Sequence, residues 1–210
     1  MGVFDRAHIS KRVALVLALG GLFGFQPAEM NAQTFTPLVG LYAPVSDLGQ
    51  ALEAIDFGDR ESTTAFGLNV DFGARNGTGF RLGAFYGTDS EVPIDGVGCT
   101  TCSARAGVFG AGGALLLRPI PWLGILQPHG IVGAGAKWYS IDPKGVEDLV
   151  ADQSHFMGQL GVGVSIGTGN GSTRLIAEIS DYMSGFEFID GESGDLQHDF
   201  LMMVGLSFGG

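Results

Sequence analysis

The sequence predicts an all-β fold: a single antiparallel, up-and-down transmembrane β-barrel of about eight strands. Three observations support this prediction. The chain is rich in apolar residues but has no long apolar block, and several segments alternate large apolar residues with small or polar ones. The connections between these segments are short and long in turn. A strand with lipid on one face and a polar lumen on the other has this period of two, and outer-membrane barrels have short turns at one end and long loops at the other.

Residues 1–32 have the three parts of a secretory signal peptide. Basic residues precede the apolar stretch 13–25, and a short segment of mostly small and polar residues follows it. The stretch has 13 residues, fewer than the ~18 that a membrane-spanning helix needs. We expect cleavage after Ala32, with Ala28 as an alternative site, so that residues 33–210 form the barrel domain.

The mature chain is strongly acidic. The whole chain has 11 basic and 22 acidic residues; without the three basic and two acidic residues of the signal peptide, 8 and 20 remain. No nucleic-acid partner is expected, because nucleic-acid binding depends on basic patches that neutralise phosphate. We expect no cofactor. Export also places the two cysteines in an oxidising compartment.

Eight segments of the mature chain have strand periodicity. The alternation is clearest in residues 63–74, 79–88, 156–167 and 200–208. It is weaker in residues 35–44, 108–119, 126–141 and 173–183. An even number of strands leaves both ends of the mature barrel on the periplasmic side.

The connections predict how the hairpins pair. Long loops are expected at about 45–62, 89–106, 142–155 and 185–199, and short turns at 76–78, 121–124 and 170–171. A three-residue turn at 76–78 keeps Phe72 and Leu82 on the same face of their hairpin. A two-residue turn at Asn170-Gly171 pairs Ile166 with Leu175, and this dipeptide is the one that type I′ turns prefer.

Acidic residues gather in the predicted long loops, which hold 17 of the 20 acidic residues of the mature chain. The predicted outer rim therefore carries many carboxylates, among them Asp47, Glu53, Asp56, Asp59, Glu61, Asp190, Glu192 and Asp195. Divalent cations could bridge such carboxylates to lipopolysaccharide phosphates. A solvated loop surface explains the same charges equally well.

A mixed set of charges lies on the strand faces opposite the lipid: Asp71, Arg81, Arg118, Lys137 and Glu178. A barrel of about eight strands has a lumen only wide enough for side chains. Unpaired charges in so narrow an interior would be costly, so we expect these residues to form an ion-pair network that closes the lumen. A gated conducting path is the alternative.

Two cysteines, Cys99 and Cys102, fall in the second predicted loop, where we expect a local disulfide. The alternative is a tetrahedral zinc site with His155 and His198, but these histidines are far from zinc-finger spacing, and no metal is predicted. The segments 154–155 and 193–199 contain the residue types of a catalytic triad without a spacing that fixes one. We therefore do not predict an enzyme.

With the signal peptide, strands and alternating connections in place, the chain resembles the small outer-membrane barrels of the OmpA transmembrane-domain and OmpX type. The resemblance covers about residues 34–210, and the segments 37–42 and 200–208 carry it most directly. It implies an outer-membrane location and assembly by the barrel-assembly machinery, which reads a terminal aromatic residue. Here Phe208 is followed by two glycines.

These observations predict a monomeric integral outer-membrane barrel with a structural or surface-interaction role and a closed, charge-plugged lumen. Its expected partners are outer-membrane lipids and lipopolysaccharide. The alternatives are a narrow porin-like channel for small or apolar solutes and a barrel enzyme that acts on lipids.

Overall fold

The structure is a computed structural model. It describes residues 33–45, 49–51, 55–57, 61–73, 77–96, 99–119, 123, 125–144, 153–168, 172–185 and 196–209. At residues 49–51, 55–57, 90–96, 99–104, 141–144 and 153 the description is limited to the backbone. The predicted signal peptide and its cleavage site lie outside the described residues. In the described part of the chain, no helix is long and apolar enough to span a membrane.

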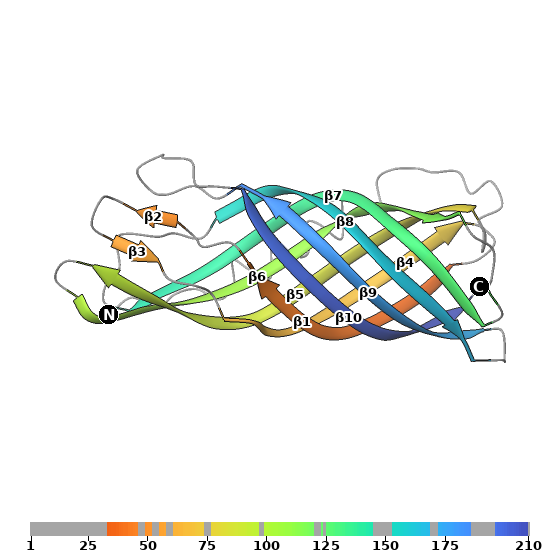
Figure 1. Cartoon of the computed structure of the whole chain (residues 1–210), viewed down its shortest axis with the longest axis horizontal. Helices are drawn as coiled ribbons and strands as arrows, with labels where there is room; N and C mark the ends of the chain where they lie inside the picture. The colour runs from red at the N-terminus through yellow and green to blue at the C-terminus, as the bar shows by residue number, and fades with distance from the viewer. Residues whose placement is uncertain are drawn as a thin grey trace, which may run out of the picture. The chain divides into compact units, whose positions relative to one another are not determined.

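The described residues form one antiparallel sheet, drawn in Figure 1. Its strands are β1 (Thr34–Pro44), β2 (Gly49–Ala51), β3 (Ile55–Phe57), β4 (Thr63–Gly73), β5 (Gly77–Gly96), β6 (Cys99–Arg118), β7 (Leu126–Lys144), β8 (Gln153–Gly167), β9 (Thr173–Ser184) and β10 (Gln197–Gly209). Eight of them follow one another in the order β5-β4-β1-β10-β9-β8-β7-β6, and β5 also pairs with β6, which closes the barrel. The predicted all-β, eight-stranded antiparallel barrel is confirmed.

The strands are strongly staggered around the barrel. A path through directly paired residues leaves β1 at Thr34, crosses every barrel strand once and returns to β1 at Pro44, 44 − 34 = 10 residues further on. A stagger of this size over eight strands corresponds to a strand tilt of about 40°. Because of this tilt, residues that meet inside the lumen come from distant positions in the strands.

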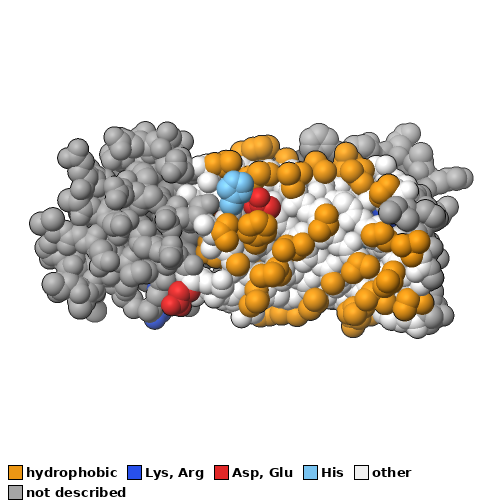
Figure 2. All heavy atoms as spheres, in the orientation of Figure 1, with side chains coloured by type: hydrophobic (Ala, Val, Ile, Leu, Met, Phe, Trp, Pro, Cys, Tyr) orange, Lys and Arg blue, Asp and Glu red, His pale blue; other side chains and the backbone are white. Residues whose placement is uncertain are grey.

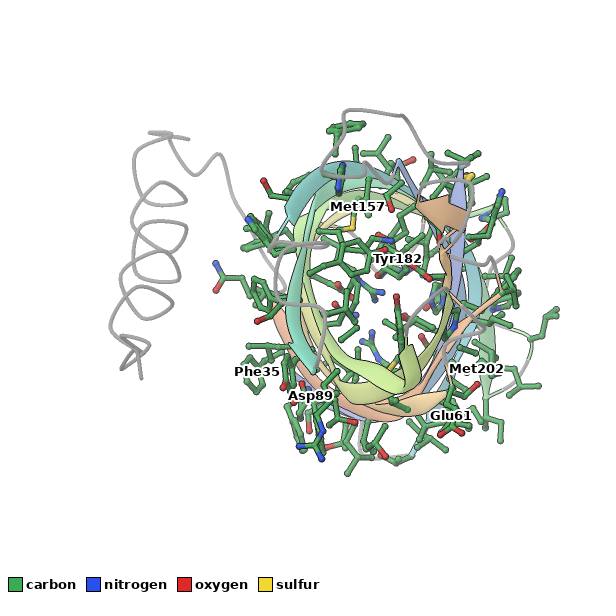
Figure 3. The ribbon with its side chains drawn as sticks, turned by 90° about the vertical axis from the view of Figure 1, so that its left-hand side faces the viewer. Phe35, Glu61, Asp89, Met157, Tyr182 and Met202 are labelled. Carbon is green, nitrogen blue, oxygen red and sulfur yellow. The ribbon has the colours of Figure 1, made fainter. Side chains whose placement is uncertain are left out.

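The barrel wall has an apolar outer face. Large hydrophobic side chains that are 40% exposed or more come from every barrel strand: they include Phe35, Val39, Leu41, Phe66, Leu68, Phe80, Leu82, Tyr86, Leu115, Leu117, Val132, Phe156, Leu160, Val162, Leu175, Ile179, Met202, Val204, Leu206 and Phe208. They make a belt over the outside of the barrel (Figure 2). Viewed along the barrel, Phe35 and Met202 point outward, whereas Met157 and Tyr182 point into the lumen (Figure 3). Such a belt is what a barrel presents to lipid.

The predicted registers hold in one hairpin and shift in another. Ile166 pairs with Leu175, as the two-residue turn predicts. In the β4–β5 hairpin, Phe72 and Leu82 share a face as predicted, but Phe72 pairs with Phe80, so the hairpin is centred one residue before the predicted turn. Gly77 begins β5 with a φ of 89°. A positive φ is readily adopted by glycine, and it lets the chain turn there.

The prediction of a long loop at 89–106 is wrong. β5 and β6 remain paired from Ser90 and Ala106 outward to Gly96 and Cys99, and β3 pairs with the outer part of β5. Acidic residues mark where the strands leave the apolar belt, and they do not end the strands.

Candidate functional site: the barrel lumen

Arg81 lies at the centre of a cluster of charged side chains inside the barrel. It projects inward from β5, and only 4% of its surface is exposed. Its Nε donates to Asp71 Oδ1 at 2.6 Å and its Nη2 to Asp71 Oδ2 at 3.0 Å. Asp71 is directly paired with Arg81 on the neighbouring strand β4. The planar guanidinium therefore meets the carboxylate in a two-pronged arrangement, the strongest ion-pair geometry in proteins.

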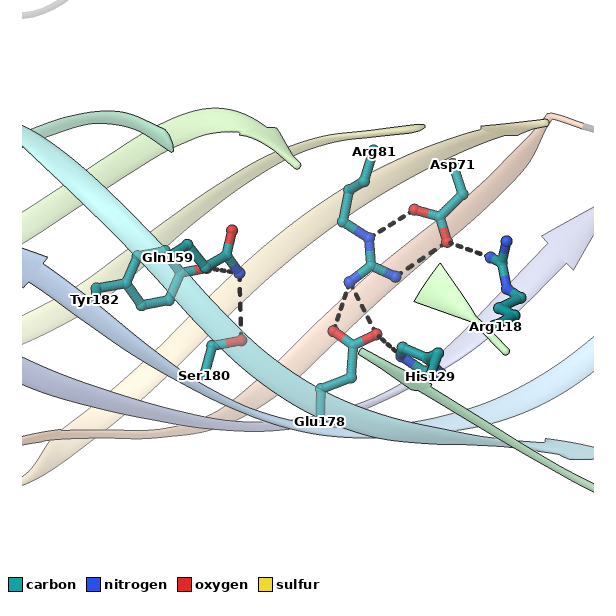
Figure 4. Close-up of polar contacts among 8 residues, drawn as sticks. All are labelled: Asp71, Arg81, Arg118, His129, Gln159, Glu178, Ser180 and Tyr182. Atoms are coloured by element: carbon teal, nitrogen blue, oxygen red, sulfur yellow. Dashed lines mark hydrogen bonds and ion pairs between the residues drawn. The ribbon is translucent and has the colours of Figure 1, made fainter. Parts of the chain in front are cut away.

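The same guanidinium reaches the opposite wall. Arg81 Nη1 donates to the two carboxylate oxygens of Glu178, at 2.8 and 2.7 Å. Glu178 is on β9, and four steps around the barrel separate β9 from β5, so each strand faces the other across the lumen. Figure 4 shows the guanidinium held between its two carboxylates. Arg81 thus joins both walls across the full width of the barrel.

Three further side chains surround this bridge. His129 Nε2 lies 2.9 Å from Glu178 Oε1, and Arg118 Nη2 lies 3.9 Å from Asp71 Oδ2. In the amide orientation that satisfies both of its polar atoms, Asn69 accepts a hydrogen bond from Arg81 Nη1 at 3.0 Å. We call Asp71, Arg81, Arg118, His129 and Glu178 the turn-end cluster, because they lie toward the short turns. Its two arginines balance its two carboxylates.

A middle layer of four uncharged side chains lies next to this cluster, on the side of the long loops: Phe85, Gln159, Ser180 and Tyr182. Gln159 Nε2 donates to the hydroxyl oxygens of Tyr182, at 2.9 Å, and Ser180, at 3.2 Å. The ring of Tyr182 packs on Phe85 with 4.7 Å between centroids. Tyr182 comes from β9 and Phe85 from β5, so this contact also joins opposite walls. Gly110 makes room for it, because a Cβ there would overlap the Phe85 ring.

A second ion pair lies toward the long loops. Lys137 on β7 and Asp199 on β10 are both fully buried, and Lys137 Nζ bonds Asp199 Oδ2. Tyr139 adds a hydroxyl donor to the same oxygen at 3.3 Å, and its ring centroid is 5.0 Å from Lys137 Nζ. We call Lys137 and Asp199 the loop-end pair. Both side chains are cut off from water, and each charge compensates the other.

Two small cavities adjoin the middle layer. Their volumes are about 10 and 20 Å³, and Asn69, Phe85, Gln159 and Tyr182 border both. A cavity needs roughly 10–15 Å³ to hold one water molecule. The space beside the middle layer is therefore on the scale of single waters.

The structure brings together four of the five lumen charges that the sequence singles out: Asp71, Arg81, Arg118 and Glu178. Lys137 is not in this cluster. Its partner is Asp199, which falls within the predicted fourth loop, 185–199, but lies in β10 with its side chain inward. Expecting Asp199 in an exposed loop was wrong, because β10 begins at Gln197 and its alternation turns Asp199 toward the lumen.

Sequence reasoning also missed His129, Gln159 and Tyr182. His129 has the same parity as Lys137 within the predicted strand 126–141, so the alternation alone could have assigned it to the lumen. The predicted pairing of Ile166 with Leu175 also places Gln159 opposite Tyr182, so the turn at Asn170-Gly171 could have identified them as neighbours. Their pairing follows from the β8–β9 register.

The predicted disulfide lies outside the described side chains and stays a prediction. Cys99 and Cys102 both fall in β6. Three residues of extended strand separate Cα atoms by roughly 10 Å, whereas a disulfide spans up to about 7 Å. A disulfide between Cys99 and Cys102 therefore requires that the backbone from 99 to 102 depart from the extended conformation.

His155 and His198, the histidines of the alternative zinc site, have separate neighbours. His155 lies near the Tyr139 ring, with 6.4 Å between centroids, and His198 Nδ1 is 2.8 Å from Asp181 Oδ2. Among the described residues, no three histidine, cysteine or acidic side chains are grouped so that they could hold a metal ion. Glu61 is exposed, and Asp56 lies in β3. The remaining predicted rim acids lie outside the described residues: Asp47, Glu53, Asp59, Asp190, Glu192 and Asp195.

The chain matches no protein-family model and no curated protein. Solved structures share its fold. Neisserial surface protein A has a TM-score of 0.52 at 11% identity, with 84% of this chain and 96% of that chain covered. The outer membrane protein OprG from Pseudomonas aeruginosa has 0.53 at 15% identity, with 86% and 97% covered. A major outer membrane protein from Thermus thermophilus has 0.52 at 12% identity, with 85% and 99% covered.

At these identities the likeness is one of fold. It confirms the predicted resemblance to small outer-membrane barrels at that level. The closed barrel and its apolar belt place the chain in a bacterial outer membrane.

Proposed function

We propose that this outer-membrane barrel does not conduct solutes and that it acts through its outer surface, in a structural or surface-interaction role. The observation that carries the proposal is the bridge from Asp71 through Arg81 to Glu178, which ties opposite walls of the lumen together. The middle layer and the loop-end pair lie beyond it along the same axis. A solute would have to displace all three.

The energetic argument concerns the charges. Breaking a buried ion pair by removing one partner costs about 3–5 kcal/mol, because an uncompensated charge is left in a low-dielectric interior. An ion that passed through the barrel would have to separate Arg81 from Glu178 and Lys137 from Asp199. Each of these pairs is buried on both sides. A closed lumen is therefore the state that this sequence favours.

Ion efflux from potassium-loaded proteoliposomes tests the proposal. The wild-type barrel should leave efflux close to that of protein-free vesicles. An Arg81→Ala/Glu178→Ala double variant should accelerate efflux, because it removes the bridge from both walls while Asp71 keeps Arg118 nearby. Arg118→Ala is the matched control, because it removes a charge and leaves the bridge in place. Wild-type efflux as fast as that of the double variant would contradict the proposal.

We propose further that the acidic outer loops bind lipopolysaccharide through divalent cations. The support is the concentration of 17 of the 20 acidic residues in the predicted loops. Glu61 and Asp89 are exposed near the loop end of the barrel (Figure 3). Carboxylate oxygens are suitable ligands for calcium and magnesium, and phosphates can complete their coordination.

The proposed binding of lipopolysaccharide is tested by the unfolding temperature of the barrel in lipopolysaccharide, measured once with magnesium and once with EDTA. Magnesium should stabilise the wild-type barrel, and a variant neutralised at Glu187, Asp190, Glu192 and Asp195 should lose that gain. Asp199 is kept in this variant because it is the buried partner of Lys137. An unchanged response to magnesium would exclude cation bridging by this loop.

We propose no catalytic role. His198 and Asp199 are consecutive in β10 and therefore point to opposite faces of the wall. Asp199 is engaged by Lys137 inside the lumen. The residue types of a triad near the fourth loop are thus divided between the two sides of the barrel.

A further inference from the structure

The seam between β1 and β10 contains a proline within the barrel wall. Pro37 lies in β1, which pairs with β4 on one side and with β10 on the other (Figure 1). A proline has no N–H to donate, and in sheets it is usually confined to edge strands or bulges. The β1–β10 register is the same on both sides of Pro37, so no bulge accommodates it.

The backbone of Pro37 faces β10. Val45 N donates to His198 O at 3.0 Å across this seam, so the odd-numbered residues of β1 direct their backbone groups toward β10. Leu206, which the register places opposite Pro37, therefore receives no N–H from β1 for its carbonyl. Direct pairing with β10 is absent at residues 36 and 37, whereas the β1–β4 and β9–β10 ladders run on past this position.

This gap isolates the turn end of the seam. Two directly paired positions of β1, Thr34 and Phe35, lie on the turn side of the gap, and seven lie on the loop side. The two outer pairs lack the hydrogen bond that a residue other than proline would donate next to them. The turn end of the seam is therefore held more weakly than the loop end.

The order of the strands lets β1 and β10 part at this end. β1 is the first barrel strand and β10 the last, so no connecting segment joins them directly. Each other pair of neighbouring barrel strands is consecutive in the chain or, for β1 and β4, linked through β2 and β3. Residues 34–37 of β1 keep their pairing with β4, and residues 206–208 of β10 keep theirs with β9. Separation would therefore open a slit between two strands that both stay in place.

The slit would lie between lipid and the turn-end cluster. On the outside, Phe35 and Phe208 are directly paired and about half exposed, so they cover the seam toward lipid. On the inside, Thr36 is buried, and its Oγ1 has no hydrogen-bond partner among the described residues. Thr36 is directly paired with Asn69, which neighbours Arg81. A buried hydroxyl without a partner is unfavourable, and water that entered the slit would supply one.

We propose that the barrel wall opens at the turn end of the β1–β10 seam and admits water to the turn-end cluster. Pro37 is the residue that distinguishes this seam from the others. The middle layer and the loop-end pair lie beyond the slit and stay closed when it opens. The slit is independent of the acidic loops, and it would remain if the lumen conducted ions.

Residue-resolved hydrogen exchange tests the slit, followed by NMR of the full barrel in nanodiscs and corrected for intrinsic exchange rates. Each strand carries its own control, because successive amides point to opposite neighbours. The amides of Phe35 and Phe208 face the seam, whereas those of Thr36 and Ser207 face β4 and β9. In the wild-type barrel the first two should exchange about fivefold to tenfold faster than the other two, the effect of about one hydrogen bond.

Two variants make the result specific to the proline. Pro37→Val restores an N–H and should slow the amides of Phe35 and Phe208 to the rates of their neighbours. Pro128→Val is the matched control, because Pro128 lies beyond the last residue of β7 that pairs with β6, and it should change none of these rates.

Equal exchange at the two faces of β1 in the wild-type barrel would overturn the proposal. Equal slowing of all four amides in Pro37→Val would also overturn it, since exchange would then report unfolding of the whole barrel.

Discussion

The turn-end cluster and the loop-end pair solve the same problem in one lumen in different ways. Both bury charges of opposite sign in a narrow interior. In the turn-end cluster, Arg81 shares its charge between Asp71 and Glu178, with Arg118 and His129 close by. At the loop end, Lys137 bonds Asp199, and the hydroxyl of Tyr139 donates to the same carboxylate. The difference lies in how many partners remain when one residue is lost.

The shared cluster should therefore tolerate substitution better than the single pair. Its five side chains come from five strands, so the loss of one leaves charges that still have neighbours. The loop-end pair is fully buried and holds one positive and one negative group. We expect the number of partners, more than the number of charges, to decide what each substitution costs.

The largest effect is expected at Lys137. Lys137→Met removes the ammonium group that bonds the buried Asp199, and the free energy of unfolding should fall by about 3–5 kcal/mol. Urea unfolding of the barrel in phospholipid vesicles, followed by tryptophan fluorescence, measures this. A loss below about 1 kcal/mol would mean that water reaches Asp199.

Arg81→Met should cost less, although Arg81 makes more hydrogen bonds. His129 remains beside Glu178 and Arg118 remains near Asp71, so we expect a loss of about 2–3 kcal/mol. The same urea titration measures it. If Arg81→Met proved more destabilising than Lys137→Met, sharing of charge would not explain the difference between the two sites.

Arg118→Met should have a smaller effect, about 1 kcal/mol, the net contribution of a typical polar contact. Its Nη2 is 3.9 Å from Asp71, beyond hydrogen-bond distance, and Asp71 keeps its two bonds from Arg81. Unfolding in parallel with Arg81→Met gives the comparison directly. Equal losses in the two variants would show that Arg118 is as central to the cluster as Arg81.

The smallest change is expected when both members of the loop-end pair become apolar. Lys137→Met with Asp199→Leu removes both charges together, and such replacements are often neutral or stabilising. The double variant should recover most of the stability that Lys137→Met loses, as unfolding in urea would report. A double variant as unstable as the single one would assign the cost to packing and not to the unpaired charge.

The alternation of the strands was enough to find most of the turn-end cluster. In the segments 63–74 and 79–88 the two faces are so distinct that Asp71 and Arg81 could be assigned to the lumen from parity. Parity does not depend on length or register, so it survives errors in strand boundaries. The same reasoning placed Glu178 and Lys137 inside.

The partners could not be predicted in this way, because they depend on register. The predicted turn at 76–78 would have paired Asp71 with Gly83, whereas the observed turn pairs it with Arg81. Contacts across the lumen depend in addition on the stagger accumulated over all eight strands. Asp199 was missed for a simpler reason: it belongs to an acidic run and was assigned to the loop, although β10 had already begun.

Planar-bilayer recording of the wild-type barrel tests the closed lumen most directly. Openings of the Arg81→Ala/Glu178→Ala variant show that barrels insert into the bilayer under these conditions. Purified wild-type barrels should then give no stable open level. The bridge through Arg81, the middle layer and the loop-end pair should hold the lumen shut together, so that removal of the bridge opens it. Stable, long-lived conductance of the wild-type barrel would contradict the account.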